Sequence, residues 1–173
     1  QGTVGVGVDV LGQYAIRLDG GKGRSGGGGI DFFKQGASGS AANDLAKGGA
    51  AVKARFSKTV FKFGEQLMNL PVLATSDNRL LPETTQGWLV TSKEIPDLTL
   101  HAGHFTALRS RDQSEHDSGG MTSLDLFGGN YTVNKQLNVR AYHSDVGDYW
   151  RKYYLGSTLA LPISEGLAAT FDF

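Results

Sequence analysis

TVGVGVDVLGQYAIRL, residues 3–18, alternates apolar side chains with small or polar ones over most of its length. Valine occupies every even position from Val4 to Val10, whereas Gly7 and Asp9 stand among the residues between them. Successive side chains of a β-strand point to opposite faces of a sheet, so the pattern predicts one long strand. One face of this strand is apolar and the other is small or polar.

The same alternation recurs along the rest of the chain and predicts about nine strands. The further strands are expected in AVKARF (51–56), VFKFGEQL (60–67), GWLVTSKE (87–94), LTLHAGHFTALRS (98–110), SLDLFGGNYTV (123–133), LNVRAY (137–142), YYLGSTLAL (153–161) and LAATFDF (167–173). Several of them exceed the five or six residues that are usual in soluble proteins.

Long and short connections follow one another in turn. Long polar or Gly-rich loops are expected at 19–49, 68–85 and 110–120, and tight turns at 57–59, 95–97 and 134–135. Outer-membrane barrels have long loops on one side of the membrane and tight turns on the other. The alternation therefore predicts an all-β fold, an antiparallel transmembrane β-barrel.

The apolar face is then expected to meet lipid, with aromatic residues near the strand ends as interfacial girdles. Residues predicted to point away from the lumen are Val4, Val6, Val8, Phe61, Phe63, Trp88, Val90, Leu137 and Val139. The girdle residues are Trp88, Tyr131, Trp150 and Tyr153. The alternative is that these side chains cover the core of a soluble β-sandwich.

Composition excludes several other classes of protein. No stretch approaches the roughly 18 apolar residues of a membrane helix. The chain has no cysteine and a formal net charge of +0, which argues against thiol chemistry and against a broad basic face for nucleic acid. We expect no cofactor, no metal and no catalytic residue. His101 and His104 are three apart on a strand and should point to opposite faces, and a loop metal site at Glu115, His116 and Asp117 is a minor alternative.

The polar face of the strands leans positive. By parity the inward cations are Arg17, Lys53, Arg55, Lys62, Lys93, Arg109 and Arg140, and the inward acids are Asp9, Asp125 and Asp172. A basic lumen concentrates anions and excludes cations. The alternative is a solvated strand face of mixed charge.

Several motifs resemble the OprD family of substrate-specific outer-membrane porins, in order across nearly the whole chain. They are QGTVGVGVDVLGQYAIRLD, AVKARFSKTVFKFGEQ, LPVLATSDNRLLPETTQG, VTSKEI, LTLHAG and YYLGSTLALPI. The resemblance implies a barrel of about 18 strands that passes small carboxylate-bearing solutes, such as amino acids or aromatic and cyclic acids. It also implies that residues 1–173 are an internal fragment, a partial barrel domain of roughly half a barrel that lacks the first and last strands, and we expect that this fragment does not fold alone.

The resemblance further implies a place in the cell and partners. The protein would be a multi-pass protein of the outer membrane of a Gram-negative bacterium, in contact with lipid and lipopolysaccharide. It would bind small anionic or carboxylate solutes and no nucleic acid. Whether the whole protein is a monomer or a homotrimer stays open at this point.

In the family the long third loop folds into the lumen and forms the constriction, and residues 68–85 match that loop. Arg79 falls where the family places a constriction arginine, and Lys53, Arg55 and Lys93 lie in motifs of its basic ladder. The Gly-rich loop and the HDSGG segment depart from the pattern and leave the substrate open. Two other functions remain: an outer-membrane barrel enzyme of protease or lipase type, and a soluble ligand-binding β-sandwich.

Overall fold

The computed structural model describes residues 3–18, 32–35, 41–116, 121–147, 149–164 and 167–173. Most of the Gly-rich loop expected at 19–49 and most of the HDSGG segment lie outside these residues. Among the described residues no helix is long and apolar enough to cross a membrane.

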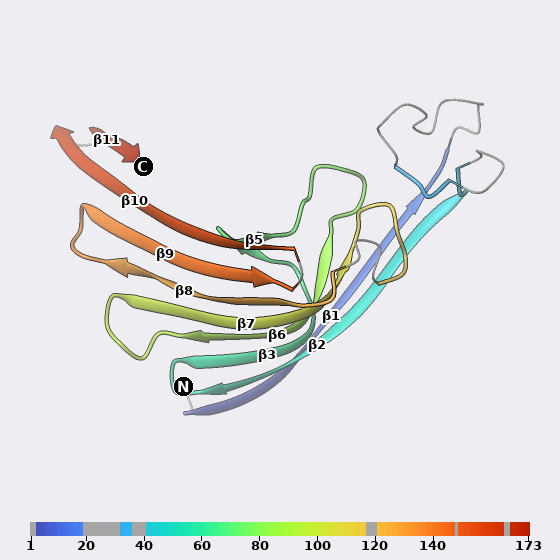
Figure 1. The fold of residues 1–173 in the computed structure, drawn as a ribbon, viewed down its shortest axis with the longest axis horizontal. Coiled ribbons are helices and arrows are strands. Elements are labelled where there is room, and N and C mark those ends of the chain that lie inside the picture. The colour runs from blue at the N-terminus through green and yellow to red at the C-terminus, as the bar shows by residue number, and fades with distance from the viewer. Residues whose placement is uncertain (1–2, 19–31, 36–40, 117–120, 148, 165–166) are drawn as a thin grey trace.

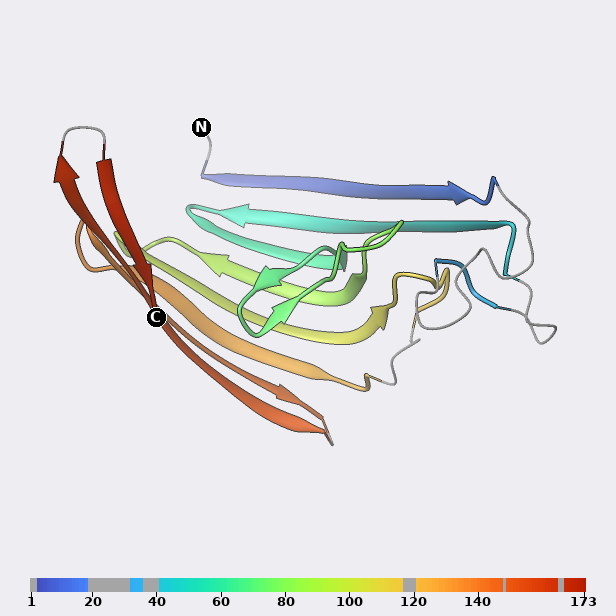
Figure 2. The ribbon, with the colours of Figure 1, turned by 90° about the horizontal axis from the view of Figure 1, so that it is seen from above.

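Nine strands form one antiparallel sheet in which each strand pairs with its neighbours in the chain (Figures 1 and 2). They are β1 (Val4–Ile16), β2 (Asp44–Phe56), β3 (Thr59–Gln66), β6 (Thr84–Ser92), β7 (Leu98–Arg109), β8 (Leu124–Thr132), β9 (Leu137–Val146), β10 (Trp150–Ser164) and β11 (Leu167–Asp172). The expected all-β antiparallel fold is confirmed. The sheet curves into a trough with β1 and β11 at its two edges (Figure 1).

A short hairpin, β4 (Asn69–Leu70) and β5 (Leu73–Ala74), forms a second sheet inside the expected loop at 68–85. It stands over the concave side of the large sheet (Figures 1 and 2). A second difference is that β2 begins at Asp44, inside the expected Gly-rich loop, because its first residues pair with the end of β1 as far as Ile16. Pairing along the whole of β1 satisfies backbone groups that a loop would leave open.

The apolar residues expected to face lipid share the convex side of the trough. Residues paired directly across an antiparallel ladder have side chains on the same face. One such row joins Val6 through Ala54 to Phe61 and then to Val90. Val6 is 88% exposed, and no second large sheet covers this face within the described part of the chain. The soluble-sandwich arrangement is therefore wrong for these residues.

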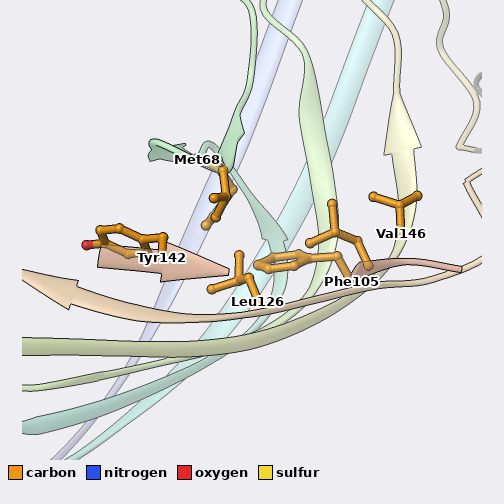
Figure 3. Packing of buried hydrophobic residues seen from close by; sticks show 7 residues of the cluster. Met68, Phe105, Leu126, Tyr142 and Val146 are labelled. Atoms are coloured by element: carbon orange, nitrogen blue, oxygen red, sulfur yellow. The ribbon is translucent and has the colours of Figure 1, made fainter. Parts of the chain in front are cut away.

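The main core lies instead between the hairpin and the concave face. Met68 and Val72 come from the hairpin segment and pack against Phe105 of β7, Leu126 of β8 and Tyr142 of β9 (Figure 3). Phe105 is fully buried, which explains why an aromatic residue stands on the otherwise polar face of β7. Burying such side chains contributes about 1.5–3 kcal/mol each and holds the hairpin down.

Two predicted orientations are wrong for the same reason. Leu124 and Leu126 face the concave side beneath the hairpin, so Asp125 between them points to the convex side with His104, its ladder partner. Trp150 pairs with the buried Val146 and therefore also faces the concave side. The alternation predicts that apolar side chains meet lipid, but a loop that folds over the sheet offers them a second apolar surface.

Candidate functional site

The concave wall formed by β1, β2 and β3 carries long basic side chains over a floor of glycine. A side-chain carbon built at Gly5 would meet the Arg55 guanidinium at 3.7 Å, and one at Gly7 would meet the Lys53 chain at 2.9 Å. The glycines of β1 thus leave the space in which Arg55 and Lys53 of β2 lie. The alternation that predicted the strand also makes room for its charged neighbours.

Asp9 joins two of these cations into one cluster. Its Oδ1 accepts from Lys53 Nζ at 2.5 Å and its Oδ2 from Lys62 Nζ at 2.9 Å. All three side chains are partly exposed, and three neighbouring strands supply them. With two ammonium groups and one carboxylate, this Asp9 cluster keeps one net positive charge on the concave wall.

Lys93 lies at the tight-turn end of the same face. It follows β6, is exposed, and lines a shallow pocket of about 550 Å³ together with Thr99 and Asn130. Thr99 and Asn130 are ladder partners on the concave side. Lys93 therefore lies on the concave side of the sheet, at the end where the tight turns are.

Arg140 of β9 faces the same side but is tied to its neighbours. Its Nη2 donates to Thr158 Oγ1 at 3.0 Å and lies 3.5 Å from Asp172 Oδ1. Asp172 therefore faces inward as expected and offsets the charge of Arg140. Because its charge is offset, Arg140 contributes less to the positive electrostatic potential of the concave wall than the Asp9 cluster does.

Arg109 faces inward, but it is 2% exposed and does not line open space. Its Nη1 donates to the Gly48 carbonyl at 3.1 Å, and its Nη2 lies 2.7 Å from His116 Nε2 and 3.6 Å from Glu65 Oε1. His116 Nε2 in turn lies 2.6 Å from Glu65 Oε2. Its expected role as a solute contact is therefore corrected, because these contacts cover it and make it an anchor for segment 110–116.

Arg17 has a similar anchoring position at the long-loop end of β1. Its Nη1 donates to the Ala41 carbonyl at 2.8 Å and its Nη2 to Asn43 Oδ1 at 2.7 Å. These bonds close the end of the β1–β2 ladder. Arg17 faces the concave side by parity, and its guanidinium holds the start of β2.

Arg79 belongs to segment 75–83, which returns from the hairpin to β6, and it is half-buried. This segment is closed on itself, since Ser76 N donates to Glu83 Oε2 at 2.9 Å and Glu83 N donates to the Ser76 carbonyl at 2.8 Å. Arg111 fastens it from outside through Asn78 and lies 3.6 Å from Glu83. Segment 75–83, which carries Arg79, is thus fixed in place by hydrogen bonds within the segment and by its contacts with Arg111.

Three inward or loop cations escaped the sequence analysis. Lys47, which is expected in a loop, is instead a buried residue of β2, where its Nζ donates to the carbonyls of Pro82 and Ser110 at 2.8 and 2.7 Å. Arg111 falls in the polar loop expected at 110–120, and the alternation gives no face for Lys152, which precedes the strand expected at 153–161. Lys152 is two residues after Trp150 and shares its face of β10. An inward orientation of Trp150 would therefore also predict an inward Lys152.

The histidines are not gathered into one site. His101 Nδ1 lies 3.0 Å from the Tyr142 hydroxyl on the concave side, whereas His104 Nδ1 lies 2.7 Å from Asp125 Oδ1 on the convex side. The predicted opposite orientation of these two residues is confirmed. Within the described ranges no group of three or more acidic, histidine or cysteine residues could hold a metal ion. The alternative site at Glu115, His116 and Asp117 includes Asp117, which lies outside these ranges.

Comparisons with known proteins agree on one family. The family model described as "outer membrane porin, OprD family" matches residues 1–173. Porin D of Pseudomonas aeruginosa is 36% identical over 181 residues, which cover 100% of this chain and 40% of that protein. The porin-like protein GalP of Pseudomonas putida is 36% identical over 88% of this chain and 39% of its own length. The chain thus spans about two fifths of the curated relatives that it matches.

Solved structures of similar sequence have the same fold. OccAB1 of Acinetobacter baumannii is 34% identical with a TM-score of 0.88, covering 99% of this chain and 41% of its own. OccK9 (OpdG) of Pseudomonas aeruginosa is 36% identical with a TM-score of 0.86, over 94% and 44% of the two chains. OpdK of the same organism, solved with vanillate, is 28% identical with a TM-score of 0.86, over 95% and 44%. The curved sheet, the folded-in hairpin and this match over its whole length place the chain in the OprD family of outer-membrane porins.

Proposed function

We propose that the whole protein is an outer-membrane channel for passive, selective uptake of small carboxylate-bearing solutes through a basic lumen. In this proposal the convex face contacts outer-membrane lipid and lipopolysaccharide, and the concave face lines the lumen. The observation that carries it is the Asp9 cluster, where Lys53 and Lys62 hold one carboxylate between them. Charge at the wall of a narrow water-filled pore acts on every ion that passes.

The accessible cations are arranged so that a carboxylate can bind them one after another as it moves along the wall. Lys53 and Arg55 are two residues apart on β2, so both side chains point inward one above the other. Arginine can bond both oxygens of a carboxylate with its planar fork, and lysine offers a mobile point charge. A solute can then exchange one partner for the next without entering a deep trap.

Arg79 completes the proposal as the constriction residue. It lies on segment 75–83, which follows the hairpin, and in this proposal that segment narrows the lumen. A charge in such a place is screened by little water and acts strongly on a passing carboxylate. One structure of a related porin, OpdK, was solved with vanillate, which is an aromatic carboxylate.

An enzymatic function has less support. The family is one of porins, and the described histidines are divided between the two faces or, like His116, held in the ion-pair contact with Glu65. A barrel protease or lipase needs a nucleophile, a base and an acid that converge on one site. The described residues bring no such set together.

The test is ion conduction by the full-length protein in planar bilayers. Under a potassium chloride gradient we expect the reversal potential to show preference for chloride, with the preference decreasing at high salt as the wall charges are screened. Vanillate should interrupt the current, whereas guaiacol, which has the same ring without the carboxylate, should not. Cation selectivity, or equal block by both compounds, would contradict the proposal.

A further inference from the structure

A pocket of about 450 Å³ lies on the concave face beneath the hairpin and apart from the Asp9 cluster. Its walls are mainly apolar: Val72 and Leu73 of the hairpin, Leu124 of β8 and Val146 of β9. The pocket is near the long-loop ends of β7, β9 and β10. A dry apolar cavity of about 150 Å³ suffices to bind benzene, so this pocket has room for a substituted ring.

Two aromatic rings and one cation form the edge of this pocket. Tyr149 and Trp150 meet edge to face at 6.2 Å, and both are 62% exposed although they line an apolar site. Exposed apolar surface of this kind on the inner side of a channel indicates a place where a ligand binds. Aromatic rings in this edge-to-face arrangement also favour another ring as a partner.

The cation is Lys152, two residues after Trp150 on the same face of β10. Its Nζ donates to the Pro71 carbonyl at 3.2 Å, a neutral acceptor at the turn of the hairpin. Among the described residues it has no carboxylate partner, in contrast to Lys53 and Lys62, which share Asp9. Lys152 thus brings a positive charge to the rim of an apolar pocket.

We propose that this pocket binds the ring of small aromatic monocarboxylates, with Lys152 holding the carboxylate at the rim. The inference rests on the proposed function and names a binding site that is separate from the constriction. Ligand pockets are commonly apolar with one or two polar groups that fix orientation, as here. The two parts discriminate differently: Lys152 selects the charge, and the walls together with Trp150 select the ring.

The experiment compares two carboxylates of equal charge in the full-length channel. Block of the ion current by benzoate and by acetate is measured in planar bilayers for the unaltered protein and four variants. Benzoate should bind about tenfold more tightly than acetate, because most of one ring leaves water. Trp150→Ala should remove most of that difference and leave acetate block unchanged, whereas Lys152→Gln should weaken block by both.

Matched controls come from the opposite face of the same strand. Tyr153 and Arg151 alternate with Lys152 along β10 and point to the convex side, where Arg151 pairs with Asp145 at 2.8 Å. Tyr153→Ala and Arg151→Gln remove a ring and a cation of similar size without touching the pocket. Both should leave the ratio of benzoate to acetate affinity as it is.

The outcomes separate the two proposals. If neither carboxylate interacts with the channel, the proposed function and the pocket both fail. If both interact but benzoate has no advantage, or keeps its advantage in Trp150→Ala, the pocket assignment alone is overturned. The same holds if Lys152→Gln changes nothing, as it would if another segment of the whole protein filled the pocket.

Discussion

The concave face has two regions that one alternating sequence pattern describes equally well, yet they differ in chemistry. On the half of β1–β3 toward the tight turn it is open, with glycine beneath and the Asp9 cluster above. Where the hairpin covers β7–β9 it is apolar, with Phe105, Leu126 and Tyr142 buried. The difference shows that a strand face is polar or apolar according to what covers it, and not only by its side of the barrel.

The covered region also changes what the convex side carries. Where Leu124 and Leu126 turn inward, Asp125 turns outward, and Asp145 follows it with Arg151 in the same ladder row. On β1 the corresponding outward position is Val8. Charged groups on a lipid face cost least near the membrane interfaces. This row lies near the long-loop ends of β8–β10, which suits the edge of the apolar band.

The largest expected effect comes from removing the side chain of Phe105, against which the hairpin packs. Phe105→Ala should lower the free energy of unfolding by about 3–5 kcal/mol, because the ring is fully buried and leaves a cavity. The unfolding midpoint of the full-length protein in detergent measures the loss. We also expect a noisier ion current, since the hairpin loses its main contact.

Phe127→Ala is the matched control for this comparison. Phe127 is on the neighbouring strand, but its ring is 60% exposed on the convex side, so its removal leaves no cavity. An equal loss of stability in both variants would show that the hairpin does not hold the covered region together.

Much of this comparison could not have been predicted from the sequence. Parity placed Val4, Val6 and Val8 correctly, because the opposite face of this part of β1 lies against the charged side chains of Lys53 and Arg55 and not against the hairpin. It failed at Asp125 and Trp150, because alternation says that two neighbours differ in side but not which one meets lipid. The hairpin could not be predicted because two-residue strands carry no periodic signal. Lys47 could not be assigned to a strand because the two glycines that follow it are typical of a loop.

Substitution of Arg79 tests whether the loop over the concave face contributes a charge that binds solutes, in addition to its apolar packing on the sheet. Charge-assisted hydrogen bonds contribute about 1.5–3 kcal/mol, so Arg79→Ala should weaken carboxylate binding by roughly ten- to a hundredfold. Arg79→Lys should restore part of it, because it returns the charge but not the planar fork. The residence time of vanillate in current traces measures both.

A structural role for Arg79 would give a different result. If its contacts only hold segment 75–83 in place, the alanine variant should gate irregularly while the residence time of the carboxylate stays unchanged. That outcome would remove Arg79 from the proposed constriction and leave the wall cations as the selective element.

The open region is tested by altering the charge of the Asp9 cluster in both directions. The double variant Lys53→Gln with Lys62→Gln leaves Asp9 alone and should decrease the preference for chloride. Asp9→Asn leaves both ammonium groups and should increase it. The reversal potential of the full-length channel at low salt gives both shifts, each of which should be reduced well above the roughly 0.1 M salt at which the screening length is about 10 Å. Shifts of the same sign would show that the cluster does not set the selectivity.

The smallest expected effect concerns Glu94, which connects the strands of the open region to those that lead into the covered one. Its carboxylate accepts from Lys58 N at 2.7 Å, and from Ser57 Oγ and Thr59 Oγ1 at 3.0 Å each, so it joins the β2–β3 turn to the turn after β6. The bond from the Lys58 backbone, with those from the two hydroxyls, holds the pKa of Glu94 below its ordinary value. A carboxyl group whose pKa is lowered by folding stabilises the folded state above its unfolded pKa, and this contribution is lost as pH falls through the lowered value.

Glu94→Gln should therefore lower the unfolding midpoint slightly at neutral pH and not at all in strong acid, where Glu94 itself is protonated. Since Glu94 is exposed, solvent screens its charge and the shift should be small. Midpoints of the full-length protein and the variant, measured from about pH 7 down to about pH 2.5, should converge as the carboxylate is lost. Lys135→Gln, in the exposed β8–β9 turn, controls for the general effect of removing a turn charge. Parallel curves for Glu94→Gln and the unaltered protein over the whole range would show that the ionised carboxylate does not join the two turns.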